Sequence, residues 1–487
     1  MRSRYLAYLA LALVLTLGAY FRLNDLGNGS FWADECIVAM HAEADSLSDL
    51  IDRVSQDVHP PGLHLMTRPI IKTWGRSQYA LRFPSAVFGI AAILFTYILA
   101  RTQLGRGFSL LAALLLSVCP IAIEESRQLR PYSLLCLFGA LTTLSVIRLA
   151  LKPSIPRLLV AIFLCAATLY THYVGAILLI ALFASSIWVF RHTPKTRNAL
   201  LLSSLGTALL FAPWGPVLIG QLGFRPTHLW PFGLSSLKSM MLENGPFSSL
   251  ASPDSTAVAG TVLFVTLIVG ILVSIAGRNR GEAQSGACLA HCFLAFVVVS
   301  YALGFWRHFF QPKSGLLIYP ILLVLCAAGL QHIYRMLRRR RVNQIVAASV
   351  VAPLVVATAI NALEYTPRII DRSRDMALYF RDNVRDEPVI LDCDPGYRAS
   401  FEFYLPLAFP DYPSDRIFLI TNEAELRENF EKIIKFDRFW IIHVAFTHRT
   451  ALPLAAKHLE LVRGFCHGML CATLYEWPDS ADRNAEE

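Results

Sequence analysis

Long apolar runs recur along the whole chain of 487 residues, and they constrain its fold more than any other feature. A helix needs about 20 mostly apolar residues to cross a bilayer, and about eleven stretches meet this requirement. We place them at 5–21, 82–100, 108–123, 132–150, 158–171, 173–190, 198–216, 258–277, 286–305, 315–333 and 344–362. The sequence therefore predicts an all-α polytopic membrane protein, in which "THY" divides the apolar stretch at 158–190 into two spans.

Composition agrees with a membrane protein and argues against a nucleic-acid-binding one. Hydrophobic residues make up 55% of the chain and charged residues 16%, whereas about a quarter of the residues in a typical soluble domain are charged. The formal net charge is +9. The basic residues fall in short clusters between apolar runs, so they form no single patch. We expect membrane lipids, and no nucleic acid, among the partners.

The basic clusters also predict the side of the membrane on which each connection lies. Cytoplasmic connections carry an excess of Lys and Arg. With the N-terminus inside, every inside segment is short and basic, through Arg2 and Arg4, Arg101 and Arg106, Arg148, Lys152 and Arg157, Arg191, Lys195 and Arg197, Arg278 and Arg280, and Arg335 with Arg338–Arg341. The first run lacks an A-x-A-like cleavage site, so we interpret it as an uncleaved helix. We expect a multi-pass protein of the cell (inner) membrane with a cytoplasmic N-terminus, whose connections at 22–81 and 217–257 lie outside.

The sequence pattern of residues 363–487 differs from that of the transmembrane domain at 1–362. We interpret residues 363–487 as a small α/β domain on the outer, periplasmic face. The stretches "EPVILDCD", "DRIFLIT" and "RFWIIHVAF" are typical of short strands, and "EAELRENFEKII" and "LPLAAKHLE" of helices. In "FCHGMLCATLYEW" a hairpin turning at His467-Gly468 would bring Cys466 near Cys471. An oxidising compartment permits a disulfide there, but two free thiols fit the spacing equally well.

Polar residues gather at the predicted outer interface. They occur in "SFWADEC", "SQDVHPPGLHL", "SQYALRFPSA", "IEESRQLRPYSL" and "TLYTHYVG". Taken singly, each has a structural explanation: acids favour the start of a helix, an Arg reaches lipid headgroups, and tyrosines form an aromatic belt. The amphipathic "SLSDLIDRV" is expected to lie on the membrane surface. Convergence of all these stretches on one face favours a functional site.

In this order, the motifs "SFWADE", "DVHPPGLHL", "YALRFPSAVFG", "SRQLRPYSL" and "LYTHYVG" resemble the GT-C superfamily of glycosyltransferases. The likeness is to bacterial members of the dolichyl-phosphate-mannose-protein mannosyltransferase-like group. The protein O-mannosyltransferases and the enzyme that adds aminoarabinose to lipid A are relatives. The resemblance is strong over residues 20–190, looser through "FAPWGP" and the later spans, and weak in the C-terminal domain.

The resemblance implies a helical bundle whose long first outer loop carries surface helices. It also implies transfer of a sugar from a polyprenyl-phosphate donor to an acceptor of the cell envelope, which is lipid A, a polysaccharide, another glycolipid or a protein. Asp34 matches the catalytic acid of the family and would be the general base of an inverting attack, with Glu35 beside it. The expected residues for the donor phosphate and substrate are His59, Arg82, Arg130, Tyr132, His172 and Lys313.

One departure from the family pattern bears on metals. Many relatives carry an acid in the second outer connection where this chain has Gln128, and in some members that acid helps to bind a metal. Glu124 and Glu125 lie upstream and approach from a different angle. No C-x-x-C pair or H-E-x-x-H motif is present. We therefore expect metal-independent transfer without a cofactor.

Two other classes of function compete with an enzyme. A transporter or flippase of a lipid-linked sugar would show internal repeats and polar, broken helices at the midplane. We find no repeat, and the polar residues gather at one interface. A structural scaffold for an envelope assembly would use the C-terminal domain as its contact surface.

Overall fold

The computed structural model describes residues 2–223, 253–277, 281–306, 311–339, 373–384, 387–392, 395–408, 410, 413–420, 423–433, 435–444, 460–467 and 470–476. It divides into two compact units. The first comprises Met1–Leu26, Ala44–Gly75 and Tyr79–Pro367, and the second comprises Gly27–Glu43, Arg76–Gln78 and Arg368–Glu487. The predicted domain boundary after residue 362 falls outside the described residues.

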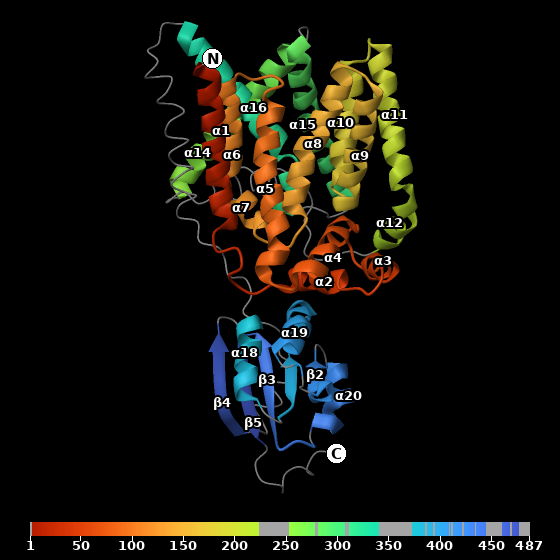
Figure 1. The fold of residues 1–487 in the computed structure, drawn as a ribbon, viewed down its shortest axis with the longest axis vertical. Coiled ribbons are helices and arrows are strands. Elements are labelled where there is room, and N and C mark those ends of the chain that lie inside the picture. Colours follow the sequence, from red (N-terminus) through yellow and green to blue (C-terminus); the bar gives the residue numbers. More distant parts are fainter. Residues whose placement is uncertain are drawn as a thin grey trace. The chain divides into compact units, whose positions relative to one another are not determined.

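The first unit is built from helices (Figure 1). They are α1 (Arg2–Leu23), α3 (Leu47–Ser55), α4 (Gly62–Trp74), α5 (Gln78–Ala100), α6 (Arg106–Ser117), α7 (Pro120–Ser126), α8 (Tyr132–Leu151), α9 (Ile155–Thr171), α10 (Gly175–Val189), α11 (Pro194–Phe211), η1 (Ala212–Trp214), α12 (Gly215–Gln221), α14 (Pro253–Ala276), α15 (Gly281–Trp306), η3 (Pro312–Leu317) and α16 (Tyr319–Arg339). Within the described residues, six helices are long and apolar enough to span a membrane, or seven if α6 and α7 form one span. Shorter apolar helices include α9 and α10.

Each predicted span up to 315–333 coincides with a helix or a helix pair. The division at "THY" is confirmed, because α9 ends at Thr171 and α10 begins at Gly175. The predicted span at 344–362 lies outside the described residues. The polytopic helical architecture expected from the apolar runs is therefore present.

The span predicted at 108–123 is wrong in one respect: it is a broken helix. Helices α6 and α7 meet at an angle of 59°, because Pro120 begins a new helix and cannot continue the preceding one. The break leaves carbonyl oxygens at the end of α6 without helical partners. The fully buried guanidinium of Arg22 donates to two of them, on Leu116 (3.2 Å) and Ser117 (2.9 Å).

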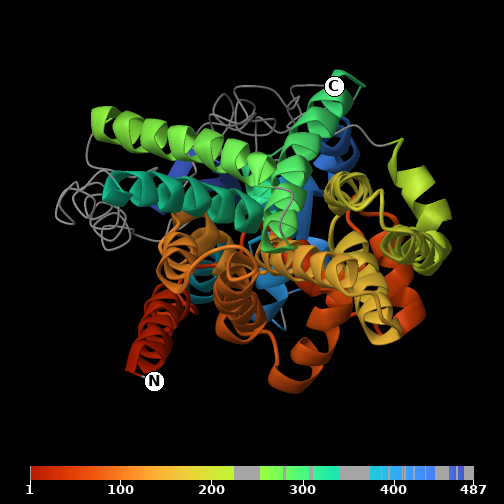
Figure 2. The same ribbon diagram turned by 90° about the horizontal axis from the view of Figure 1, so that it is seen from above.

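Small residues allow close packing between the long helices. Helices α14 and α16 run side by side (Figure 2). A Cβ on Gly270 would collide with the carbonyl of Leu325, and one on Gly329 would collide with that of Thr266. Glycines of this kind let membrane helices approach at backbone distance.

Helix α3 confirms the amphipathic pattern of "SLSDLIDRV", but protein rather than lipid covers part of its apolar face. Leu50 and Val54 are buried in one cluster with Trp214 of η1. Gln221 of α12 donates to the carbonyl oxygen of Val54 at 3.1 Å. The "FAPWGP" region, where the family resemblance is looser, thus holds the first loop in place.

The second unit contains a five-stranded sheet in the order β2-β1-β3-β5-β4 (Figure 1). Its elements are α2 (Ala33–Ala42), α18 (Ser373–Asn383), β1 (Val389–Asp392), α19 (Pro395–Ala408), η4 (Ser414–Arg416), β2 (Ile417–Ile420), α20 (Glu423–Ile433), β3 (Arg438–Val444), β4 (Glu460–His467) and β5 (Leu470–Glu476). Strands β2, β1 and β3 are parallel, and β3, β5 and β4 are antiparallel.

The predicted C-terminal α/β texture is confirmed for three strands and for the helix now called α20. Most of "LPLAAKHLE" lies outside the described residues. The hairpin is confirmed as β4 and β5, with Cys466 directly opposite Cys471 in the register. Cys471 is disulfide-bonded.

Candidate active site

The loop between α3 and α4 reads "DVHPP" and approaches the end of α9. Pro61 is the N-cap residue of α4, with a φ of −77° that the proline ring favours. Gly62 follows and packs against the backbone of Tyr170, so that a Cβ would collide with the Tyr170 carbonyl. The absence of a side chain at Gly62 therefore lets this loop lie against the connection between α9 and α10.

Five sequence-predicted residues come together there, from four separate parts of the chain. His59 and His172 have ring centres 5.6 Å apart, and the rings of Tyr132 and His172 lie 5.8 Å apart. Two cations face the ring of Tyr132: Lys313 Nζ lies 5.0 Å from its centre and Arg130 Cζ 5.9 Å. We call His59, Arg130, Tyr132, His172 and Lys313 the cationic cluster.

His172 contributes a neutral imidazole to the cationic cluster. Burial, and then the neighbouring charges of His59, Arg130 and Lys313, lower the pKa of His172 well below its usual value. Its Nδ1 accepts a hydrogen bond from the backbone N–H of Val174 at 3.2 Å, which a protonated Nδ1 cannot do. The other ring nitrogen therefore carries the proton and is a neutral donor.

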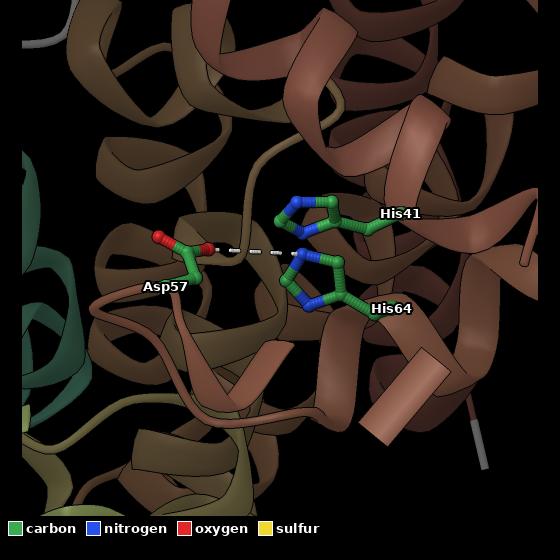
Figure 3. Close-up of side chains that lie close together, drawn as sticks. All are labelled: His41, Asp57 and His64. Atoms are coloured by element: carbon green, nitrogen blue, oxygen red, sulfur yellow. Dashed lines mark ion pairs between the residues drawn. The ribbon is translucent and has the colours of Figure 1, made fainter. Parts of the chain in front are cut away.

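Asp57 supplies the negative charge next to the cationic cluster. Its carboxylate lies 3.8 Å from His59 Nδ1 and 4.0 Å from His64 Nε2; Figure 3 shows the ion pair with His64. Burial by itself would raise the pKa of Asp57, but the interactions with His59, the Val58 N–H and His64 lower it below its usual value. Asp57 therefore stays ionised beside the two imidazoles.

Sequence reasoning did not single out Asp57 and His64. The signal was present in "DVHPPGLHL", where an acid stands two residues before one His and seven before another. His64 is buried on the first turn of α4. A helix that begins at Gly62 places His64 next to the preceding loop.

The remaining predicted residues of the first unit lie on α5, on α7 and just after α7. Arg82 is buried on α5, with 6% of its surface exposed. Glu125 is buried on α7, Glu124 is half-buried there, and Gln128 is buried just after the helix. The acids Glu124 and Glu125 thus stand four and three residues before Gln128.

Asp34 and Glu35 lie in the first turn of α2, in the second unit. Glu35 is fully buried and accepts a hydrogen bond from the backbone N–H of Trp32 at 3.3 Å. Glu35 therefore holds the start of the helix, as a capping-box acid does. Asp34 is half-buried, so part of this residue remains accessible at the surface of α2.

The cationic cluster has the chemistry of a phosphate site. Arg130 and Lys313 supply positive charge, and His59, neutral His172 and Tyr132 supply further hydrogen-bonding groups. Charge-assisted hydrogen bonds to a phosphate are about twice as strong as neutral ones. The fold and this cluster together define a class: polytopic membrane proteins with a cationic site in the connections between their helices.

Part of the chain matches one protein family. Residues 58–216 match the family described as dolichyl-phosphate-mannose-protein mannosyltransferase. The matched region includes four members of the cationic cluster and excludes Asp34 and Lys313. No curated protein sequence matches the chain.

Solved structures extend the likeness to nearly the whole chain. ArnT from Cupriavidus metallidurans in its apo state superposes with a TM-score of 0.63 at 13% identity, over 97% of this chain and 98% of that one. The same protein bound to undecaprenyl phosphate gives a TM-score of 0.57 at 13% identity, over 96% and 97% of the two chains. The oligosaccharyltransferase AglB from Archaeoglobus fulgidus, in complex with an inhibitory peptide and a dolichol-phosphate, gives 0.58 at 13% identity, over 97% of this chain and 74% of that one. The protein thus has the GT-C fold of these structures over nearly its whole length, and the family match lies within it at residues 58–216.

Proposed function

We propose that the protein transfers a sugar from a polyprenyl-phosphate donor to a hydroxyl group of an envelope acceptor, on the outer face of the cell membrane. The cationic cluster carries this proposal, because it suits the phosphate of such a donor. The undecaprenyl phosphate bound by ArnT, which has the same fold, supports the choice of lipid. A lipid-borne donor also fits an outward-facing transferase, since nucleotide sugars remain in the cytoplasm.

The reaction is a single displacement with inversion. The acceptor oxygen attacks the anomeric carbon while its proton passes to the carboxylate of Asp34. The bond between the anomeric carbon and the phosphate oxygen breaks, and its electron pair stays on the phosphate. Arg130, Lys313 and His59 stabilise that charge, and polyprenyl phosphate leaves. Asp57 lies 3.8 Å from His59 Nδ1 and orients this imidazole, and Glu35 holds the helix turn that bears Asp34.

A transfer assay with purified protein and a synthetic polyprenyl-phosphate sugar tests the base. Asp34→Asn removes the proton acceptor and keeps the size of the side chain. Turnover should fall by about 10²–10⁴-fold, with donor binding unchanged. The matched control is Asp52→Asn, which changes an exposed acid on α3 and should leave turnover intact. Full activity of Asp34→Asn would remove this residue from the mechanism.

We also infer that transfer needs no metal, because Gln128 stands where relatives carry an acid. Treatment with a strong chelator should leave turnover unchanged within about twofold. Loss of activity on chelation, with recovery when Mn²⁺, Mg²⁺ or Zn²⁺ is added, would contradict this inference.

The acceptor is a lipid A, polysaccharide, glycolipid or protein of the envelope. Comparing the envelope glycans of cells with and without the protein would identify it, because one class should lose a single sugar. A flippase would instead change the sidedness of a lipid-linked sugar without forming a new glycosidic bond, so the purified transfer assay separates the two functions.

A further inference from the structure

The short segment that carries "FWADE" is packed onto the C-terminal domain in the same compact unit. Residues Gly27–Glu43 belong to the second unit together with Arg368–Glu487, and α2 packs against α19. The ring of Phe31 meets that of Phe403 edge to face, with centres 5.6 Å apart. At the same end of α2, the backbone N–H of Arg374 donates to Ser30 Oγ at 3.3 Å.

Tyr404 makes the most specific of these contacts. Its phenol oxygen accepts the backbone N–H of Phe31 at 2.5 Å and the side-chain amide of Gln78 at 3.1 Å. Tyr404 is 4% exposed, so water does not replace these bonds. Burial raises the pKa of Tyr404, and the phenol stays neutral at biological pH.

The two N–H groups that precede the first turn of α2 are therefore both held. Tyr404 takes that of Phe31, and Glu35 takes that of Trp32. The other end of the helix is fixed as well, because Arg76 forms an ion pair with Glu43 at 2.6 Å. The turn bearing Asp34 lies between these anchors, and two of them, Tyr404 and Arg76, are distant from it in sequence.

We infer that Tyr404 is a positioning residue for the reaction: through its bond to Phe31, the C-terminal domain holds the turn of α2 that carries Asp34. This role rests on the proposed function for its effect on turnover. The holding contact itself belongs to the second unit and is measurable without any assay of transfer.

Cys36 provides that measurement. It is buried on α2 and carries a thiol whose Sγ lies 3.8 Å from the carbonyl oxygen of Phe31. A thiol in this position reacts with a maleimide only when the turn opens. The rate at which Cys36 is labelled in the full-length protein, read by mass spectrometry of its peptide, therefore reports the loosening of the turn.

The test variant is Tyr404→Phe, which keeps the ring and removes the acceptor. Labelling of Cys36 should become about tenfold faster, and kcat should fall about tenfold, while KM for the donor stays within about twofold. The matched control is Tyr379→Phe on α18 of the same domain, whose ring packs on Trp440; it should change neither quantity. Gln78→Ala removes one of the two bonds and should give a smaller change in the same direction.

Distinct outcomes separate this inference from the proposed function. Labelling of Tyr404→Phe at the wild-type rate would overturn the inference, whatever Asp34→Asn does. Faster labelling with unchanged kcat would show that Tyr404 holds α2 without serving the reaction, which also overturns it. If Tyr404→Phe does not fold, Gln78→Ala decides: an unchanged labelling rate or an unchanged kcat sinks the inference. If Asp34→Asn is fully active, the proposed base fails, and faster labelling of Tyr404→Phe still shows the anchor.

Discussion

The residues of the cationic cluster have different roles, which depend on the groups that surround each of them. Lys313 and Arg130 face the ring of Tyr132, whereas burial and the nearby charges keep His172 neutral. The sequence placed all of these residues at one interface. It did not show that one histidine would be neutral while its neighbour pairs with Asp57, because that difference depends on which groups surround each ring.

Replacing Lys313 tests its charge on the donor phosphate. A hydrogen bond to a charged group contributes about 1.5–3 kcal/mol, so Lys313→Met should weaken binding of a polyprenyl phosphate about 10–100-fold. Lys195→Met, at an exposed site in the first turn of α11, is the control and should bind normally. Titration of the detergent-solubilised proteins with undecaprenyl phosphate measures both. Equal affinities would remove Lys313 from the phosphate site.

The lowered pKa of His172 predicts a loss of stability on acidification. An unfolded chain takes up a proton at this residue near pH 6.5, whereas the folded protein resists it, so stability is full above that pH and falls below it. The loss amounts to at most about 1.4 kcal/mol per pH unit. Asp57 also has a lowered pKa, but its contribution is lost only below about pH 4.

His172→Asn should therefore flatten the change in apparent melting temperature between about pH 7 and about pH 5, a window that excludes Asp57. The Asn side chain keeps an acceptor for the Val174 N–H. His192→Asn, at an exposed position, controls for the loss of any histidine. Parallel curves for His172→Asn and the wild type would show that His172 does not titrate differently on folding.

At the scale of elements, the site depends on where helices begin and end. Helix α4 starts at Gly62 against the end of α9, and α8 starts at Tyr132. Prolines at 60 and 61 precede α4 and a proline at 131 precedes α8, and these prolines are visible in the sequence. The residues that these helices bring together are not visible there. A sequence pattern shows where a helix begins, but only tertiary packing determines which segment lies beside it.

The contact at Gly62 gives a prediction at this scale. Gly62→Ala forces a Cβ onto the Tyr170 carbonyl, and overpacking of this kind costs about 1–3 kcal/mol. The variant should melt earlier and lose donor affinity, since the His59 loop moves with α4. Gly107→Ala in α6 meets no atom within 4 Å and should be neutral or slightly stabilising. Thermal unfolding of the two variants side by side gives the answer, and equal melting temperatures would contradict the packing argument.

At the scale of the whole molecule, the described helices and the basic connections agree on a polytopic protein. The side of the membrane on which each connection lies is predicted from the basic residues alone. A membrane-impermeant maleimide tests this prediction in intact cells or spheroplasts. Asp52→Cys on α3 should be labelled from outside, and Lys195→Cys only after the membrane is permeabilised. The wild type serves as the blank, because its described cysteines in the helical unit are buried. The reverse pattern would invert the topology and remove the outer-face reaction.

Sequence alone determined the apolar spans, the mixed α/β C-terminal region and the set of polar residues from which a site is made. Each of these is a property of a contiguous window, since a run of apolar residues needs no partner to be recognised. Only the tertiary structure decided that α6 and α7 form a bent pair held by Arg22, that Asp57 and His64 join the predicted histidines, and that "FWADE" packs with a helix 373 residues away through Tyr404. Such contacts depend on how distant segments pack, and no local pattern records which surfaces will meet.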